Sequence, residues 1–142
     1  MFIRIALGAG VFIVTLIVAT WAYYEYVANP RITRALIESP HGERASKVML
    51  LELPSRRRIP VNYLRENDRI YAGADGRWWK EIDGEGFTVS LVVRGEALTG
   101  RARAVRDDPD YTERIFAKLR PNAIKGFGTL IEIQLDGDRQ PQ

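Results

Sequence analysis

The sequence predicts a mainly β (α+β) fold: a small six-stranded antiparallel barrel with one late helix, preceded by an N-terminal transmembrane helix. Three observations predict it: an uncharged apolar run near the start, six short segments with strand patterns, and one late segment with a four-residue apolar period. The 142 residues suffice for about one globular domain. We divide the chain into an anchor (1–28), a linker with a short amphipathic helix (29–46) and the barrel (47–142).

The anchor is predicted from the run between Ile5 and Tyr24, in which no residue is charged. At about 1.5 Å per residue, such a run spans roughly 30 Å, the thickness of a bilayer's hydrocarbon core. Aromatic residues gather at its C-terminal end, as in an aromatic belt: Trp21, Tyr23, Tyr24 and Tyr26.

Two other interpretations of this run are less favoured. A cleaved signal peptide needs a short apolar region and a small-x-small site, which Thr20-Trp21-Ala22 matches poorly. A buried core helix with no polar stripe is hard to place in so small a domain. We therefore expect one membrane-spanning helix. Arg4 lies at one end of it, and Arg31 and Arg34 lie beyond the other, so the flanking positive charges do not decide its orientation in the membrane.

The linker begins at Asn29-Pro30, where we expect the helix to be interrupted or to end. The stretch from Arg31 to Glu38 is amphipathic, with Ile32, Leu36 and Ile37 on one side, and is expected at the membrane interface. Ser39-Pro40-His41-Gly42 then predicts a turn.

The barrel is predicted from six short apolar or alternating segments separated by Gly, Asp and Pro. They are Val48–Leu53, Ile59–Leu64, Arg69–Ala74, Phe87–Arg94, Ala97–Val105 and Thr129–Leu135. One helix precedes the last strand, with Asp108 as N-cap, Pro109 in the first turn and Pro121 after its end. Its residues Tyr111, Ile115 and Leu119 recur every four positions and should face the core.

Composition narrows the chemistry. The chain has no cysteine, which excludes disulfides, a thiolate nucleophile and Cys-ligated metals, and its single histidine, His41, leaves no zinc cluster. The net charge of +3 favours anionic partners such as phosphates or acidic lipids, and we expect no nucleic-acid partner.

Three groups of residues could bind a ligand. Arg56, Arg57 and Arg58 form either an anion clamp or a solvated turn. The Asp75–Lys80 segment holds Gly76, Trp78, Trp79 and Lys80, which form either a wall for a flat ring or a turn with core tryptophans. Arg101 and Arg103 share one strand face, which is more often exposed to solvent than functional.

The order of these pieces carries a resemblance. A first strand leads through a basic loop to a proline that opens the second strand (VMLLELPSRRRIPVNYL), and a third strand ends in small residues before a Trp-Trp segment (IYAGADGRWWKEI). An Arg-Gly turn and a strand with Gly-x-Ala follow (VSLVVRGEALTGRARAV). From Lys47 to Leu135 this order resembles the deazaflavin-dependent nitroreductase family of the flavin-binding split-barrel superfamily. The resemblance implies that the barrel is a split β-barrel.

The resemblance also implies a cofactor, either coenzyme F-420 (a deazaflavin) or, as the alternative, FMN. Arg56, Arg57 and Arg58 would hold its phosphate or acidic tail, and Pro60 would start the second strand. The backbone of Ala72, Gly73 and Ala74 would approach the ring, which Trp78, Trp79 and Lys80 would wall. Neither a catalytic side chain nor a metal is expected, because such a cofactor carries the reaction itself.

The leading hypothesis is a single-pass oxidoreductase of the cell membrane, transferring hydride to a lipophilic acceptor such as a quinone or nitro compound. Because the cofactor is cytoplasmic, the barrel is expected on the cytoplasmic side. The alternative is a membrane-tethered, non-catalytic binding module that has lost the cofactor. It is favoured by the sequence PSRRR, which lacks the glycines of the family's Gly-Arg-Lys-Ser-Gly loop. Electrostatic attachment to acidic lipid is compatible with both, and a homodimer, common among related barrels, stays open.

Overall fold

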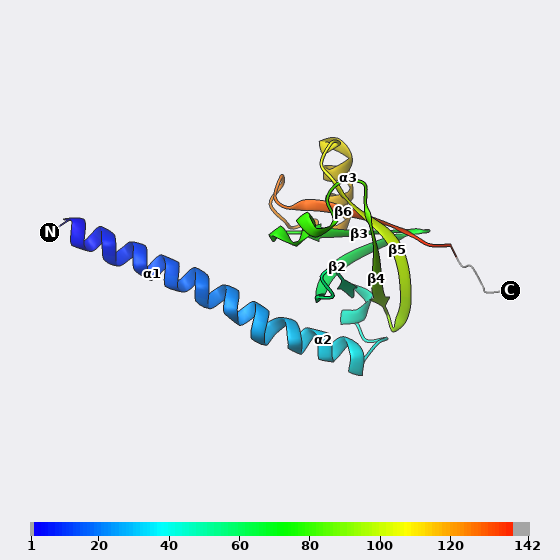
Figure 1. Cartoon of the computed structure of the whole chain (residues 1–142), viewed down its shortest axis with the longest axis horizontal. Coiled ribbons are helices and arrows are strands. Elements are labelled where there is room, and N and C mark those ends of the chain that lie inside the picture. Colours follow the sequence, from blue (N-terminus) through cyan, green and yellow to red (C-terminus); the bar gives the residue numbers. More distant parts are fainter. Residues whose placement is uncertain (1, 138–142) are drawn as a thin grey trace.

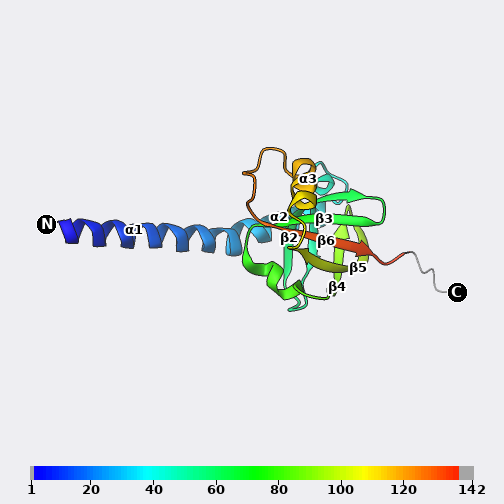
Figure 2. The same cartoon turned by 90° about the horizontal axis from the view of Figure 1, so that it is seen from above.

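The chain folds as one long helix that projects from a closed β-barrel (Figures 1 and 2). The computed structural model describes residues 2–137 and, of residues 2–9 and 11, only the backbone. The side chains of Arg4 and of Ile5, at the start of the predicted span, therefore lie outside the described part, as do both predicted outer domain limits, residues 1 and 142.

The sequence predicted that the helix would be interrupted or would end at Asn29-Pro30. It does not end there, but a π-helical turn interrupts the α-helix directly before Asn29. α1 (Phe2–Tyr23) continues through a π-helical turn (Tyr24–Ala28) into α2 (Asn29–Glu38). The N–H of Asn29 donates to the carbonyl of Tyr24, five residues back, and Pro30 occupies the first turn of α2. A proline lacks an N–H and its ring crowds the preceding turn, so a wider turn directly before it lets the helix continue.

No helix in the described part of the chain is both long and apolar enough to cross a membrane. The predicted transmembrane helix is therefore not confirmed.

Six antiparallel strands close the barrel in the order β1-β2-β3-β6-β5-β4. Their bounds are β1 (Val48–Glu52), β2 (Arg58–Glu66), β3 (Arg69–Ala74), β4 (Phe87–Val93), β5 (Glu96–Val105) and β6 (Thr129–Leu135). All six predicted strands are present, with the same bounds for the third and sixth and ends that differ by one or two residues for the others.

Alternate residues of each strand fill the interior with aliphatic side chains. Met49, Leu51, Ile70 and Ile133 are fully buried there. A short 3-10 helix after β3, η3 (Arg77–Ile82), packs Trp78, Trp79 and the buried Ile82 against this core. The opposite phase of β5 exposes Arg101 and Arg103, as the alternation predicted.

α3 (Pro109–Leu119) lies on the outer face of the sheet, between β5 and β6 in the chain. Asp108 caps it as predicted, because its side chain accepts a hydrogen bond from the N–H of Tyr111. Ile115 is buried against Tyr71, Val105 and Leu130, and forms a second small core outside the barrel.

α2 packs against the barrel through Leu36 and Ile32, which contact the outer face of β1 at Leu50. Ile37, expected on the same face, is 65% exposed. The other short 3-10 helix, η2 (Arg44–Ser46), leads from this contact into β1. The amphipathic stretch therefore docks on the barrel through two of its three predicted apolar residues, and its place at a membrane interface stays a prediction.

Candidate functional site

The arginines of the β1–β2 turn do not converge on one point. Arg56 and Arg58 both pair with Glu52, at 3.3 and 2.8 Å, whereas Arg57 lies 3.6 Å from Glu81. The hydrogen bond from Arg58 lowers the pKa of Glu52 below its usual range. The predicted clamp is thus divided into two ion-paired groups, although Arg56 and Arg58 remain largely exposed.

The barrel wall opens between β2 and β3. The two strands pair only from Tyr63–Ala72 onward, so Pro60 and Val61 pair with β1 alone, and Gly73 and Ala74 pair with β6 alone. A hollow of about 220 Å³ lies in this seam. It is lined by Pro60, Val61, Asn62, Gly73, Asp75, Gly76, Trp78, Leu119 and Arg120.

Three predicted site residues, Pro60, Gly73 and Trp78, therefore meet at the seam hollow. The side chains of Ala72 and Ala74 point into the barrel core, with exposures of 0% and 1%, so only their backbone could touch a ligand. Trp79 lies outside the hollow, with the Arg106 and Lys80 cations over its ring at 5.1 and 5.7 Å.

Arg120, just after α3, closes one side of the seam hollow. Its guanidinium stacks on Phe116 at 4.0 Å, pairs with the Asp75 carboxylate and donates to the carbonyl of Phe127. Its Nε is buried and has no hydrogen-bond partner within the described chain. An unpartnered buried donor is costly, so Arg120 has unused capacity to bind an acceptor.

Two glycines make room for this arginine. A Cβ on Gly73 would come within 3.3 Å of the Arg120 guanidinium. Gly128 has a φ of +88°, and a Cβ there would collide with Arg120 and lie 2.8 Å from Asp75. The sequence analysis missed Arg120, because an arginine before a proline at a helix end is an ordinary local pattern.

A larger hollow, about 500 Å³, lies between α3 and the loop of residues 121–128. Apolar side chains such as Phe116, Ala117 and Ile124 line it together with Arg106 and Lys125, and Arg120 belongs to this hollow as well as to the seam. Its volume falls in the range of small-molecule sites, roughly 300–1,000 Å³. None of the predicted site residues lines it.

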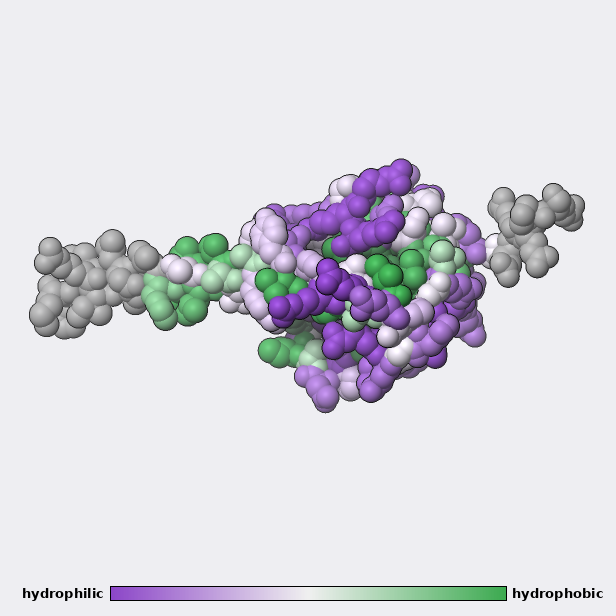
Figure 3. Space-filling view, turned by 90° about the horizontal axis from the view of Figure 1, so that it is seen from below, coloured by the Kyte–Doolittle hydropathy of each residue, from purple (hydrophilic) through white to green (hydrophobic). Residues whose placement is uncertain are grey.

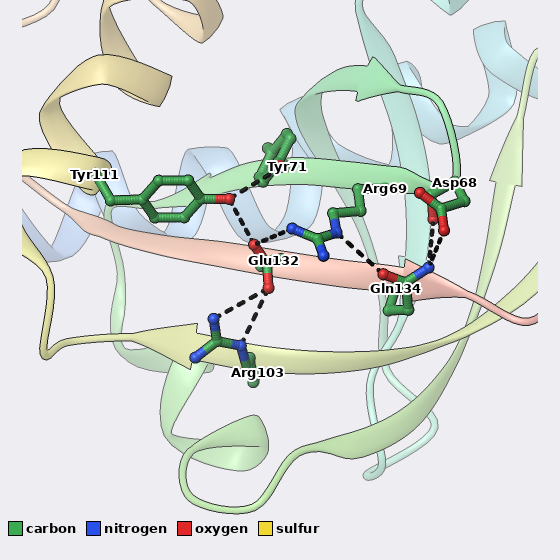
Figure 4. Close-up of polar contacts among 7 residues, drawn as sticks. All are labelled: Asp68, Arg69, Tyr71, Arg103, Tyr111, Glu132 and Gln134. Carbon is green, nitrogen blue, oxygen red and sulfur yellow. Dashed lines mark hydrogen bonds and ion pairs between the residues drawn. The ribbon is translucent and has the colours of Figure 1, made fainter.

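A buried carboxylate, Glu132 on β6, gathers polar side chains beneath α3 (Figure 4). Arg103 approaches it to 3.1 Å and Arg69 to 3.8 Å. The hydroxyl of Tyr111 lies 2.6 Å from Glu132 and 3.0 Å from that of Tyr71. Because a hydroxyl has one hydrogen, Tyr111 donates to Glu132 and accepts from Tyr71.

This Glu132 cluster is fully satisfied and fixes α3 to the sheet. Burial, followed by the hydrogen bond to Glu132, raises the pKa of the Tyr111 hydroxyl, which therefore stays protonated. A hydrogen bond with Tyr71 raises the pKa of Arg69. The signal available in the sequence was one glutamate among the apolar residues of β6.

Of the comparisons with known proteins, only the one with solved structures finds a match. No protein-family model and no curated protein matches the chain. A solved structure from Listeria innocua, provisionally assigned as a pyridoxamine 5'-phosphate oxidase, is 15% identical. It aligns over 75% of this chain and 92% of its own length, with a TM-score of 0.51.

The chain is a split β-barrel. At this identity the likeness shows the fold alone, and it confirms the split-barrel part of the predicted resemblance. Membership in the deazaflavin-dependent nitroreductase family stays a prediction.

Proposed function

We propose that this split barrel is an oxidoreductase that binds FMN or a deazaflavin such as coenzyme F-420 at the β2–β3 seam and reduces a lipophilic acceptor, a quinone or nitro compound. The observation that carries the proposal is the seam hollow, where Gly73, Trp78 and Arg120 meet. The structural neighbour supports the reaction class, since it is described as an oxidase.

The residues present fit part of such a cofactor. Trp78 offers the edge of an aromatic wall, Gly73 leaves space for close approach to the backbone, and Arg120 has an unpartnered Nε. A planar group with acceptor atoms matches this set. At about 220 Å³ the hollow holds one portion of the cofactor, and the remainder would extend over the surface toward Arg58 on the same outward phase of β2.

When bound, the cofactor supplies hydride chemistry that no side chain of the site provides. The protein's part is to hold and shield it. Trp78 excludes water from one side of the hollow, and Arg120 stabilises negative charge between the two hollows it lines. The 500 Å³ hollow beside Arg120 offers an apolar place for the acceptor.

Attachment to the cell membrane is part of the proposal. Most of the described side chains of α1 are apolar and exposed, among them Phe12, Ile17 and Trp21 at 64%, 63% and 61%. Water is a poor environment for such a helix, whereas lipid covers it. With a cytoplasmic cofactor, the barrel would lie on the cytoplasmic side.

The test is a titration of the full chain in detergent with FMN and, separately, with F-420, following cofactor fluorescence. We expect micromolar binding of one of them and a loss of at least about 10-fold in affinity for Gly73→Val, which fills the seam. The matched control is Gly137→Val, since a Cβ at Gly137 meets no atom within 4 Å. Binding that ignores Gly73→Val would place the cofactor elsewhere.

The second candidate is a binding module without cofactor, favoured by the ion pairs that occupy all three turn arginines. Exposed pairs of this kind are worth about 0–1 kcal/mol, so a phosphate can displace them. If the chain is the proposed oxidoreductase, we expect replacement of Arg56, Arg57 and Arg58 by alanine to weaken the binding of the cofactor. Failure of both cofactors to bind the wild-type chain would favour the module.

A further inference from the structure

The loop of residues 121–128 exposes apolar side chains at its tip. All eight residues, Pro-Asn-Ala-Ile-Lys-Gly-Phe-Gly, are exposed, and none is acidic. Ile124 and Phe127 are 82% and 55% exposed. Single exposed apolar residues are common, whereas two large ones on one short loop form an apolar patch that a partner surface can cover.

A second exposed apolar surface lies on the helix. Large apolar side chains are exposed at nearly every position from 12 to 18, so no polar stripe faces solvent (Figure 3, green beside the grey atoms). Further along, Trp21, Tyr23, Tyr24 and Tyr26 are also exposed. An aromatic group at the end of an apolar stretch is typical of the headgroup level of a bilayer.

The two surfaces face the same way. In both cartoon views the loop (orange) lies on the side of the barrel from which α1 projects, and the β2–β3 turn lies on the opposite side (Figures 1 and 2). Contacts between helix and barrel hold this arrangement: Leu36 packs on Leu50, and Glu25 lies 3.7 Å from Arg57. One flat apolar partner can therefore receive the helix and meet the loop.

Charge favours a lipid surface as that partner. η3 lies on the same side, and its Arg77 and Lys80 are exposed with no carboxylate at ion-pair distance in the described chain. Lys125, in the loop, is exposed and cationic, but it forms an ion pair with Glu113 at 2.8 Å, so its charge is only partly available to lipid. Each basic residue near an anionic bilayer adds about 1 kcal/mol of attraction.

We infer that loop 121–128 is a second membrane contact, which inserts Ile124 and Phe127 into the bilayer that receives α1. This rests on the membrane attachment proposed above. Because Ile124 also lines the 500 Å³ hollow, the contact brings the rim of that hollow to the lipid surface. A lipophilic acceptor then reaches the site from the bilayer without crossing water.

The absence of cysteine makes the test direct, because one introduced cysteine can be labelled alone. Full-length Ile124→Cys, Ile17→Cys and Asp68→Cys would each carry a polarity-sensitive nitrobenzoxadiazole dye. Each would be mixed with vesicles of phosphatidylcholine and phosphatidylglycerol containing a headgroup-level quencher. We expect a blue shift and quenching at positions 17 and 124, and no change at 68, in the β2–β3 turn.

The outcomes separate the two proposals. A dye at 124 that behaves like the one at 68, while 17 lies in lipid, overturns the loop contact and leaves the attachment standing. A dye at 17 that stays in water overturns both. A blue shift at 124 that requires no lipid and rises with protein concentration identifies a second copy as the partner and also overturns the inference.

A variant supplies the second measurement. Ile124→Asp with Phe127→Asp alters only exposed positions, so the barrel should fold, and we expect vesicle affinity to fall at least about 10-fold. Phe87→Asp, at another exposed phenylalanine on β4, is the matched control and should bind as the wild type does.

Discussion

The Glu132 cluster and the contacts of Arg120 at the seam both lie beside α3 and contain similar charged groups, but they differ in how completely those groups are paired. In the Glu132 cluster, two arginines and the hydroxyl of Tyr111 contact the buried carboxylate, and Tyr71 is hydrogen-bonded to Tyr111. At the seam, Arg120 has a partner for each terminal nitrogen but, among residues 2–137, none for its buried Nε. The difference teaches that a satisfied cluster fixes structure, whereas an incompletely satisfied one keeps capacity for a ligand.

The largest effect should come from Glu132→Gln. It leaves Arg69 and Arg103 without their carboxylate, and we expect the free energy of unfolding to fall by about 3 kcal/mol in urea denaturation. Glu113→Gln removes an exposed pair with Lys125 and should cost less than about 1 kcal/mol. If the two variants lost the same unfolding free energy, the Glu132 cluster would be no more important for stability than an exposed ion pair, which would contradict its structural role.

Arg120→Met tests the other half. The expected loss of stability is smaller, about 1–2 kcal/mol, because the partner carboxylate of Asp75 is itself exposed. Cofactor affinity should fall at least about 10-fold in the fluorescence titration. Arg106→Met alters the larger hollow and the contacts of Arg106 with Trp79 and Asp83, all outside the seam hollow, and should leave that affinity unchanged. A stability loss without a binding loss would make Arg120 another structural residue.

Tyr111→Phe gives a pH signature of about 1 kcal/mol. The folded protein raises the pKa of Tyr111 above its ordinary value of 10.0, so the stabilisation is complete below pH 10 and is lost as pH rises beyond it. Urea denaturation at pH 8 and pH 10.5 should show a smaller alkaline loss in the variant than in the wild type. Burial also raises the pKa of Tyr63, so part of the alkaline loss of stability remains in both the variant and the wild type.

The smallest effect is expected from Arg56→Ala. Its side chain is 88% exposed, and the partner Glu52 keeps Arg58, so unfolding should change by less than about 0.5 kcal/mol. Differential scanning fluorimetry of the variant beside the wild type is sufficient. A large shift in melting temperature would mean that the turn is a structural centre.

Sequence patterns recovered the elements because strand alternation and helix capping are local. The bounds of β3 and β6 and the Asp108 cap needed only neighbouring residues. Pro30 predicted that the helix would be interrupted or would end, but the form of the interruption, a π turn that lets the helix continue, has no sequence signature that we could use.

The site was predicted only in part, for a reason of distance along the chain. Pro60, Gly73 and Trp78 follow a recognisable order and do meet. Arg120 binds Asp75, 45 residues away, and Glu132 binds Arg103, 29 residues away. The first pairing depends on where the end of α3 packs, and the second on the register of β5 with β6, neither of which a local pattern encodes.

The uninterrupted helix from Phe2 to Glu38 has a mechanical consequence. At about 1.5 Å per residue it is a rod roughly 55 Å long, joined to the barrel by packed side chains rather than by a flexible tether. Such a rod transmits torque, so the barrel cannot turn without turning its stem. Under the proposed membrane attachment, the rod holds the barrel at one tilt to the bilayer, so an encounter with a membrane-bound acceptor searches positions in the membrane plane at a fixed tilt.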